Sequence, residues 1–76
     1  MTDRILDLRG LKCPLPALRT RKALREAAPG ARLRVECTDP LSSIDIPNLL
    51  RETGDALEAS AREGDVLVFR IVKAAG

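Results

Sequence analysis

The side chain best suited to chemistry in this sequence is the thiol of Cys13, which lies in the segment Arg9-Gly10-Leu11-Lys12-Cys13-Pro14-Leu15-Pro16. The residues before this segment predict a short strand, and those from Pro14 onward predict a helix. Proline fits the first helical turn, where the amides have no intrahelical partner, so the two prolines are expected to fix the backbone beside the thiol. Cys13 is therefore predicted to lie at or beside the N-cap of the helix.

This position favours a negatively charged sulfur. The free amides and the dipole of a helix attract negative charge at its N-terminus, and Arg9 and Lys12 are close in sequence. We therefore predict that the pKa of the Cys13 thiol is lowered, as it is for other thiols at helix N-termini or near cations. Because the thiolate is the nucleophile, the segment predicts sulfur chemistry; the alternative is a small apolar residue in a loop. The residues expected to support the thiolate and the helix start are Arg9, Gly10, Lys12, Pro14 and Pro16.

The elements that position this thiol follow from hydrophobic periodicity and breaker residues. Strands are predicted at residues 4 to 8, 32 to 37, 57 to 62 and 66 to 72. In the third strand Leu57, Ala59 and Ala61 alternate with polar residues and are predicted to share one face. One helix is predicted from residue 14 to about 28. A second, capped by Ser42 or Ser43, is predicted to run to about Thr53, with Pro47 in or just after its first turn and Gly54 just past its end. The order βαβαββ predicts an α+β, two-layer sandwich: a mixed four-stranded sheet with two helices on one face.

The first predicted helix has an apolar stripe that we assign to the core. Its members are Ala17, Thr20, Leu24, Ala27 and Ala28. Leu15 and Leu18 fall outside this stripe, near Arg19 and Lys22 and within about a turn of Cys13. We interpret these four as candidate contacts for a partner protein; the alternative is that the leucines are ordinary exposed apolar residues.

The second strand alternates cleanly and points Cys37 toward the core, where burial raises the pKa of a thiol and makes it inert. The alternative role for Cys37 is a resolving thiol that forms a disulfide with Cys13. If the first two strands are parallel, the loops that follow them emerge at the same end of the sheet. Asp39 and Asp45 are then candidate neighbours of Cys13, although a turn for Asp39 and a helix start for Asp45 also explain them.

Four segments together resemble one protein family. They are Leu6-Asp7-Leu8, Gly10-Leu11-Lys12-Cys13-Pro14-Leu15-Pro16, Asp39-Pro40 and Asp45-Ile46-Pro47. This arrangement is similar to the TusA-type, or SirA-like, sulfur-carrier proteins, and the resemblance covers nearly the whole chain. It implies the same two-layer fold and a persulfide sulfur carried on Cys13. It also implies a donor, such as a cysteine desulfurase or a rhodanese-like protein, and an acceptor protein in tRNA thiolation, molybdenum-cofactor assembly or sulfur oxidation.

Other function classes stay open at this point. The sequence contains no histidine, so no imidazole base activates Cys13 and a protein-only metal site is not expected. No cofactor is expected either, since pyridoxal phosphate would belong to a desulfurase donor. A nucleic-acid or regulatory binding module is the main alternative, with electrostatic tRNA contact also compatible with a carrier. A thiol oxidoreductase is the third, and it would need Cys37 to reach Cys13.

Composition and charge set the remaining limits. At 76 residues the chain is predicted to be one domain, residues 1 to 76, with an aliphatic core because Phe69 is the single aromatic residue. Residues 1 to 38 hold nine basic and four acidic side chains, and residues 39 to 76 hold four and seven, so the halves carry +5 and −3. A basic first half would attract acidic protein partners or a phosphate backbone; the alternative is a mixed solvated surface with no role in binding. The first residues lack the layout of a signal peptide and the apolar runs are too short to span a membrane, so we expect a cytoplasmic protein without a membrane anchor. A monomer is expected because a carrier must present Cys13 to large partners.

Overall fold

Six elements follow one another along the chain, which is described over residues 3–74 by a computed structural model. They are β1 (Asp3–Leu8), α1 (Leu15–Glu26), β2 (Arg32–Cys37), α2 (Ser42–Thr53), β3 (Ala56–Glu63) and β4 (Val66–Val72). Both helices have 12 residues. Within the described range, no helix has the length and apolar character needed to cross a bilayer.

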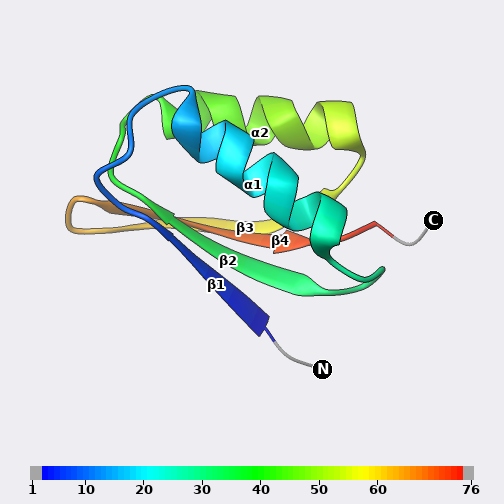
Figure 1. Cartoon of the computed structure of the whole chain (residues 1–76). Coiled ribbons are helices and arrows are strands. Elements are labelled where there is room, and N and C mark those ends of the chain that lie inside the picture. Colours follow the sequence, from blue (N-terminus) through cyan, green and yellow to red (C-terminus); the bar gives the residue numbers. More distant parts are fainter. Residues whose placement is uncertain (1–2, 75–76) are drawn as a thin grey trace.

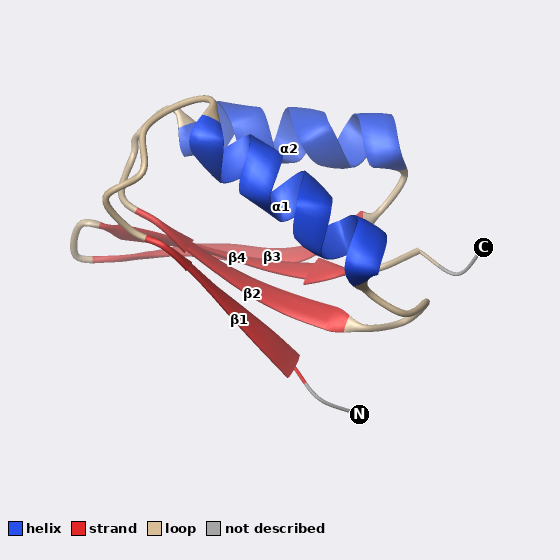
Figure 2. Ribbon diagram, in the orientation of Figure 1, coloured by secondary structure: helices blue, strands red, loops and turns tan. Residues whose placement is uncertain are grey.

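The four strands form one mixed sheet in the order β1-β2-β4-β3. β1 and β2 are parallel, whereas β4 is antiparallel to both β2 and β3. Both helices lie on the same face of this sheet, and the other face is open (Figures 1 and 2). The predicted fold class is therefore confirmed. Because β1 and β2 are parallel, the loop that carries Cys13 and the loop that carries Asp39 leave the sheet at the same end.

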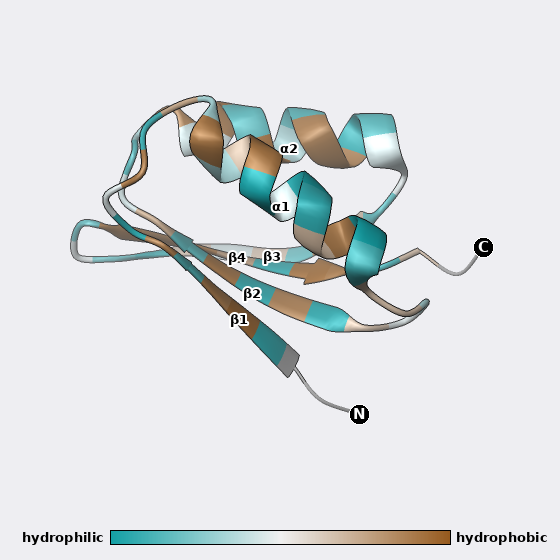
Figure 3. Cartoon of the chain, viewed as in Figure 1, coloured by the Kyte–Doolittle hydropathy of each residue, from teal (hydrophilic) through white to brown (hydrophobic). Residues whose placement is uncertain are grey.

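The core lies between the helices and the inner face of the sheet. β2 alternates as predicted, with Leu33, Val35 and Cys37 buried beneath the helices and hydrophilic residues between them (Figure 3). Leu8, Phe69 and Ile71 continue this layer on the neighbouring strands, and Ile46 and Leu50 close it from α2. The described core is thus aliphatic apart from Phe69, as the composition predicts.

α1 is shorter than predicted and buries a different stripe. It ends at Glu26, and Ala27 already has an extended backbone with ψ 144°; a helix is disfavoured just before Pro29. The buried positions are Pro16, Thr20, Ala23 and Leu24. Thr20 and Leu24 were predicted correctly, but Ala17 is only half-buried because the buried stripe is rotated toward Pro16 and Ala23. Ala27 and Ala28 lie beyond the end of the helix, where Ala27 is half-buried and Ala28 is exposed, so their assignment to the helical stripe was wrong.

α2 begins without a serine cap, so this prediction was also wrong. Its N-cap is Leu41. The hydroxyls of Ser42 and Ser43 instead donate backward to the carbonyl oxygens of Asp39, at 2.6 Å, and Pro40, at 2.8 Å. The Asp39 carboxylate accepts from the Leu41 amide at 3.0 Å, so Asp39 forms the turn before α2, which is one of the two roles predicted for it. Pro47 lies in the second turn of the helix, and Gly54, with φ +83°, ends it as predicted.

β3 contains a register irregularity that the sequence pattern conceals. Leu57 is opposite Ile71, but the next pair is Ala59 with Arg70, so one extra residue interrupts the ladder. Leu57 faces the helix layer, and Ala59 faces the open side. The predicted shared face of Leu57 and Ala59 is therefore wrong. Because β3 is an edge strand and all its residues are exposed, no buried face enforces the register here.

Candidate functional site

Cys13 lies in the loop between β1 and α1 and is exposed. It comes directly before Pro14, the N-cap of α1, so its predicted place beside the cap is confirmed. The loop turns at Gly10, which has φ +85°, a conformation that glycine adopts without strain. The Gly10 amide donates to Thr38 Oγ1 at 2.8 Å and so joins this loop to the one after β2. Thus Gly10 helps to set the position of the thiol.

Two carboxylates from the second half of the chain meet Cys13. The Cys13 amide donates to Asp39 Oδ2, and the thiol donates to Asp45 Oδ2, with an Sγ to Oδ2 distance of 2.7 Å. Asp39 comes from the loop after β2, and Asp45 from the first turn of α2. The prediction that both residues lie within reach of Cys13 is therefore confirmed. The parallel pairing of β1 and β2 brings them there.

These carboxylates reverse the expected acidity of the thiol. The hydrogen bond to Asp45 raises the pKa of Cys13, and partial desolvation by neighbouring atoms and the negative charges of Asp45 and Asp39 raise it further. The prediction of a lowered pKa was thus wrong. In the other direction, hydrogen bonds from the amides of Leu41 and Cys13 lower the pKa of Asp39 and keep it ionised. At neutral pH the resting Cys13 side chain is a protonated thiol beside two acidic residues.

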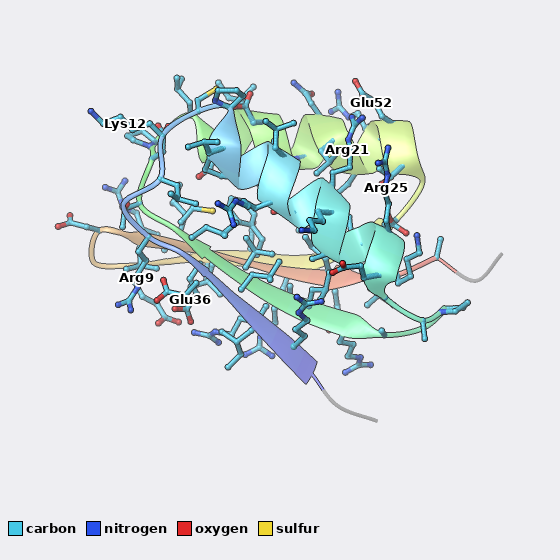
Figure 4. The ribbon with its side chains drawn as sticks, in the orientation of Figure 1. Arg9, Lys12, Arg21, Arg25, Glu36 and Glu52 are labelled. Carbon is cyan, nitrogen blue, oxygen red and sulfur yellow. The ribbon has the colours of Figure 1, made fainter. Side chains whose placement is uncertain are left out.

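The two cations expected near the thiol have different surroundings. Arg9 binds Asp7 through two hydrogen bonds of 2.8 and 2.9 Å, which helps to lower the pKa of Asp7 to about 2. Figure 4 shows Arg9 below the sheet, near Glu36 and away from the helices. Lys12 is exposed in the loop beside Cys13, and its charge helps to lower the pKa of Asp39. Of the two, Lys12 alone acts on the carboxylates at the thiol.

A groove runs from Cys13 between α1 and α2. Its volume is about 250 Å³, and its lining residues are Cys13, Pro14, Ala17, Leu18, Arg21, Asp45, Asn48, Leu49 and Glu52. Arg21 and Glu52 form an ion pair of 2.8 Å across the two helices, well away from the Cys13 loop (Figure 4). The groove therefore has an apolar floor, the reactive sulfur at one end and paired charges at the other.

Exposed apolar side chains gather at the Cys13 end of the helices. Leu15 and Leu18 are 43% and 54% exposed, as predicted, and they are joined by Leu41 and Ile44, at 52% and 58%. We call these four residues the apolar rim. Leu41 and Ile44 were not predicted from the sequence. Both are apolar residues outside the buried stripe of α2, and that position could have indicated that they are exposed. Arg19 and Lys22 are exposed beside the rim, and neither forms an ion pair with any carboxylate of residues 4–74, whose side chains the structure describes.

Burial weakens two of the alternative functions. Cys37 is 0% exposed in the core, so it has no access to Cys13 in this fold, and burial raises the pKa of its thiol. A thiol oxidoreductase that pairs these cysteines is therefore disfavoured. Phe69, the single aromatic residue of the sequence, is 3% exposed and cannot stack on a base. Any contact with nucleic acid would be electrostatic.

Comparisons with known proteins agree with this arrangement. A family model described as sulfurtransferase TusA matches residues 4–73. The sulfur carrier protein TusA of Allochromatium vinosum is 42% identical over 71 residues, which cover 93% of each chain. The sulfur carrier protein TusA of Pseudomonas aeruginosa is 37% identical over 73 residues, covering 96% of this chain and 92% of that protein. The crystal structure of a SirA-like protein from Desulfitobacterium hafniense has the same fold, with a TM-score of 0.81, 24% identity and coverage of 97% and 100%.

Proposed function

Since the chain belongs to the TusA family of sulfur carriers, we propose that Cys13 takes up one sulfur atom as a persulfide from a donor protein and passes it to an acceptor protein. The observation that carries this proposal is the position of Cys13. It is the one exposed thiol of the sequence, it lies in a loop held by hydrogen bonds to Asp39 and Asp45, and it opens onto the groove between the helices.

The transfer is an exchange between a thiol and a persulfide. The Cys13 thiol first gives its proton to water, and the resulting thiolate attacks the outer sulfur of the donor persulfide and forms a new S–S bond. The S–S bond of the donor breaks, its electron pair stays on the donor cysteine, and that cysteine is then protonated. No net oxidation occurs, and the chain needs no cofactor for this step. Because the pKa of Cys13 is raised, the free carrier should react slowly with small electrophiles at neutral pH.

The decisive test is the intact mass of the wild-type protein after incubation with a donor. A cysteine desulfurase with pyridoxal phosphate and cysteine is one donor, and a rhodanese loaded with sulfur is the other. We expect an increment of one sulfur atom that a reductant removes and that proteolytic mapping assigns to Cys13. The absence of this increment with both donors would contradict the proposal and favour a binding module. Salt-dependent RNA affinity that is unchanged in Cys13→Ser would support that alternative.

The apolar rim supplies the docking surface in this proposal. An apolar contact around the reactive sulfur excludes water, and the exposed cations Lys12, Arg19 and Lys22 favour a partner whose reactive cysteine is flanked by acidic residues. Cysteine desulfurases and rhodanese-like proteins are the donors proposed to dock there, and the acceptor belongs to tRNA thiolation, molybdenum-cofactor assembly or sulfur oxidation. We propose that the carrier acts as a cytoplasmic monomer, since a monomer leaves this whole end of the molecule accessible to large partners.

The double variant Leu15→Asp, Leu18→Asp tests this surface. It is expected to slow loading from a protein donor by about tenfold or more, since a central apolar contact is worth more than about 1 kcal/mol and the new charges repel acidic flanks. Loading from a small-molecule persulfide should be unchanged. Ile5→Asp is the matched control, because Ile5 is 63% exposed on the open face of the sheet. Wild-type rates from each protein donor in the double variant would remove these residues from the docking surface.

A further inference from the structure

The Asp45 carboxylate touches the sulfur that reacts. Cys13 Sγ donates to Asp45 Oδ2 at 2.7 Å, and Asp45 reaches it from a separate element, the first turn of α2. Asp45 is half-buried and forms no ion pair with a lysine or arginine within residues 3–74, so its negative charge is not neutralised there. The interaction of this carboxylate with Cys13 therefore depends on whether Sγ carries a proton or a second sulfur atom.

The other charged groups near the thiol do not cancel this effect. Asp39, from the loop after β2, adds a second negative charge on the amide side of Cys13. Lys12, from the Cys13 loop itself, acts on Asp39. Farther along the groove, Arg21 of α1 and Glu52 of α2 neutralise one another at 2.8 Å. The immediate environment of Sγ is thus negative.

A negative environment at Sγ changes the relative free energies of the unloaded thiol and the loaded persulfide. The unloaded thiol has a proton on Sγ and donates it in a hydrogen bond to a carboxylate, which is a strong interaction for a neutral donor. In the persulfide, Sγ is bonded to a second sulfur and has no proton, so this hydrogen bond is lost. A persulfide is also more acidic than a thiol, and its anion places negative charge next to Asp45. Asp45 therefore stabilises the thiol and destabilises the persulfide anion.

We propose that Asp45 is a discharge residue, which biases the carrier toward the unloaded thiol and so toward giving its sulfur to an acceptor. This inference rests on the proposed function of Cys13 as a persulfide carrier. In the discharge step an acceptor thiolate attacks the outer sulfur of the Cys13 persulfide and forms a new S–S bond. The bond between Sγ and that sulfur breaks, and its electron pair stays on Sγ. Sγ then takes a proton from water and restores the hydrogen bond to Asp45.

The effect concerns the equilibrium of transfer and not only its rate. A basic thiol is a slower leaving group than an acidic one, so Asp45 does not accelerate the bond cleavage itself. What it changes is the free-energy difference between the loaded and unloaded forms. The appropriate measurement is therefore the equilibrium constant for sulfur exchange between Cys13 and a small thiol.

The experiment equilibrates the full chain with glutathione and glutathione persulfide at a fixed ratio and measures the loaded fraction by intact mass. In Asp45→Asn the side chain keeps its shape and loses its charge, and we expect the exchange constant to shift several-fold toward the loaded form. Asp65→Asn, in the exposed turn between β3 and β4, makes the same change in net charge and should leave the constant at the wild-type value. An unchanged constant in folded Asp45→Asn would overturn the inference.

A second readout separates this role from a merely structural one. The rate of Cys13 alkylation by iodoacetamide as a function of pH gives the pKa of the thiol. Because the Asp45 hydrogen bond is the main cause of the raised pKa, the profile of Asp45→Asn should move to lower pH. Asp45→Ser, which also removes the charge, provides the same comparison if the asparagine variant is poorly folded. A profile identical to wild type in the folded variants would contradict the proposed contact.

Failure of this inference is distinguishable from failure of the proposed function. If the wild-type chain takes sulfur from protein donors but Asp45→Asn has the wild-type exchange constant, only the role of Asp45 is wrong. If the wild-type chain takes no sulfur from either donor, the carrier function itself is wrong, whatever the exchange constant with glutathione persulfide.

Discussion

Cys13→Ser is expected to abolish sulfur loading from every donor while leaving the fold unchanged. A serine hydroxyl is not able to form the persulfide, so no intermediate forms in the variant. The hydroxyl is, however, able to donate to Asp45 as the thiol does, and the position is exposed. The free energy of unfolding should therefore remain within about 0.5 kcal/mol of wild type. Intact mass after incubation with a donor and urea unfolding followed by circular dichroism measure the two effects.

Cys37→Ser is the matched control, because it makes the same atomic change in the opposite environment. Cys37 is 0% exposed in the core, so the new hydroxyl is buried among aliphatic side chains and should cost about 1–3 kcal/mol of stability. Loading on Cys13 should nevertheless persist at a temperature where the variant is folded. Loading that survives in Cys13→Ser, or that disappears in folded Cys37→Ser, would contradict the assignment of Cys13 as the carrier cysteine.

The fold was predictable from the sequence because its signals are local and strong. The alternation of β2, from Arg32 to Cys37, identified both the strand and the buried thiol, and breaker residues separated the elements. The prediction for β3 failed because this strand has no buried face that would fix the alternation of apolar and polar residues. β3 is exposed along its length, so a bulge after Leu57 leaves no trace in the hydrophobic pattern.

The sign of the Cys13 pKa was not predictable from the residues around it. The groups close to Cys13 in sequence are the helix N-terminus, Arg9 and Lys12, and all of them favour a thiolate. The dominant influence is Asp45, 32 residues later in the chain, whose carboxylate meets the thiol only because β1 and β2 are parallel. Arg9 does not act on the site because its guanidinium forms an ion pair with Asp7 at 2.8 Å. The sequence predicted that Asp45 lies near Cys13, but not that its carboxylate accepts a hydrogen bond from the thiol, because that contact depends on how the Cys13 loop meets the first turn of α2.

Leu24→Ala and Leu18→Ala, two equal truncations on α1, are expected to have very different effects. Leu24 is 1% exposed and belongs to the core, so its truncation should cost about 2–5 kcal/mol, through lost burial and the cavity that remains. For a domain of this size the total stability is of the order of 4–11 kcal/mol, so Leu24→Ala should lower the urea midpoint strongly. Leu18 is 54% exposed, and its truncation should change the free energy of unfolding by less than about 0.5 kcal/mol.

Comparing these two variants shows whether the apolar rim contributes to the stability of the fold or to contact with a partner protein. If Leu18→Ala unfolds at the wild-type urea concentration but slows loading from a protein donor, the side chain is exposed for contact and not for stability. Leu24→Ala should load at the wild-type rate without urea, where it remains folded, because the Leu24 side chain lies in the core between α1 and the sheet and does not line the groove. A loss of stability in Leu18→Ala comparable to that in Leu24→Ala would instead show that Leu18 stabilises the core. That result would contradict the proposal that the apolar rim is a docking surface.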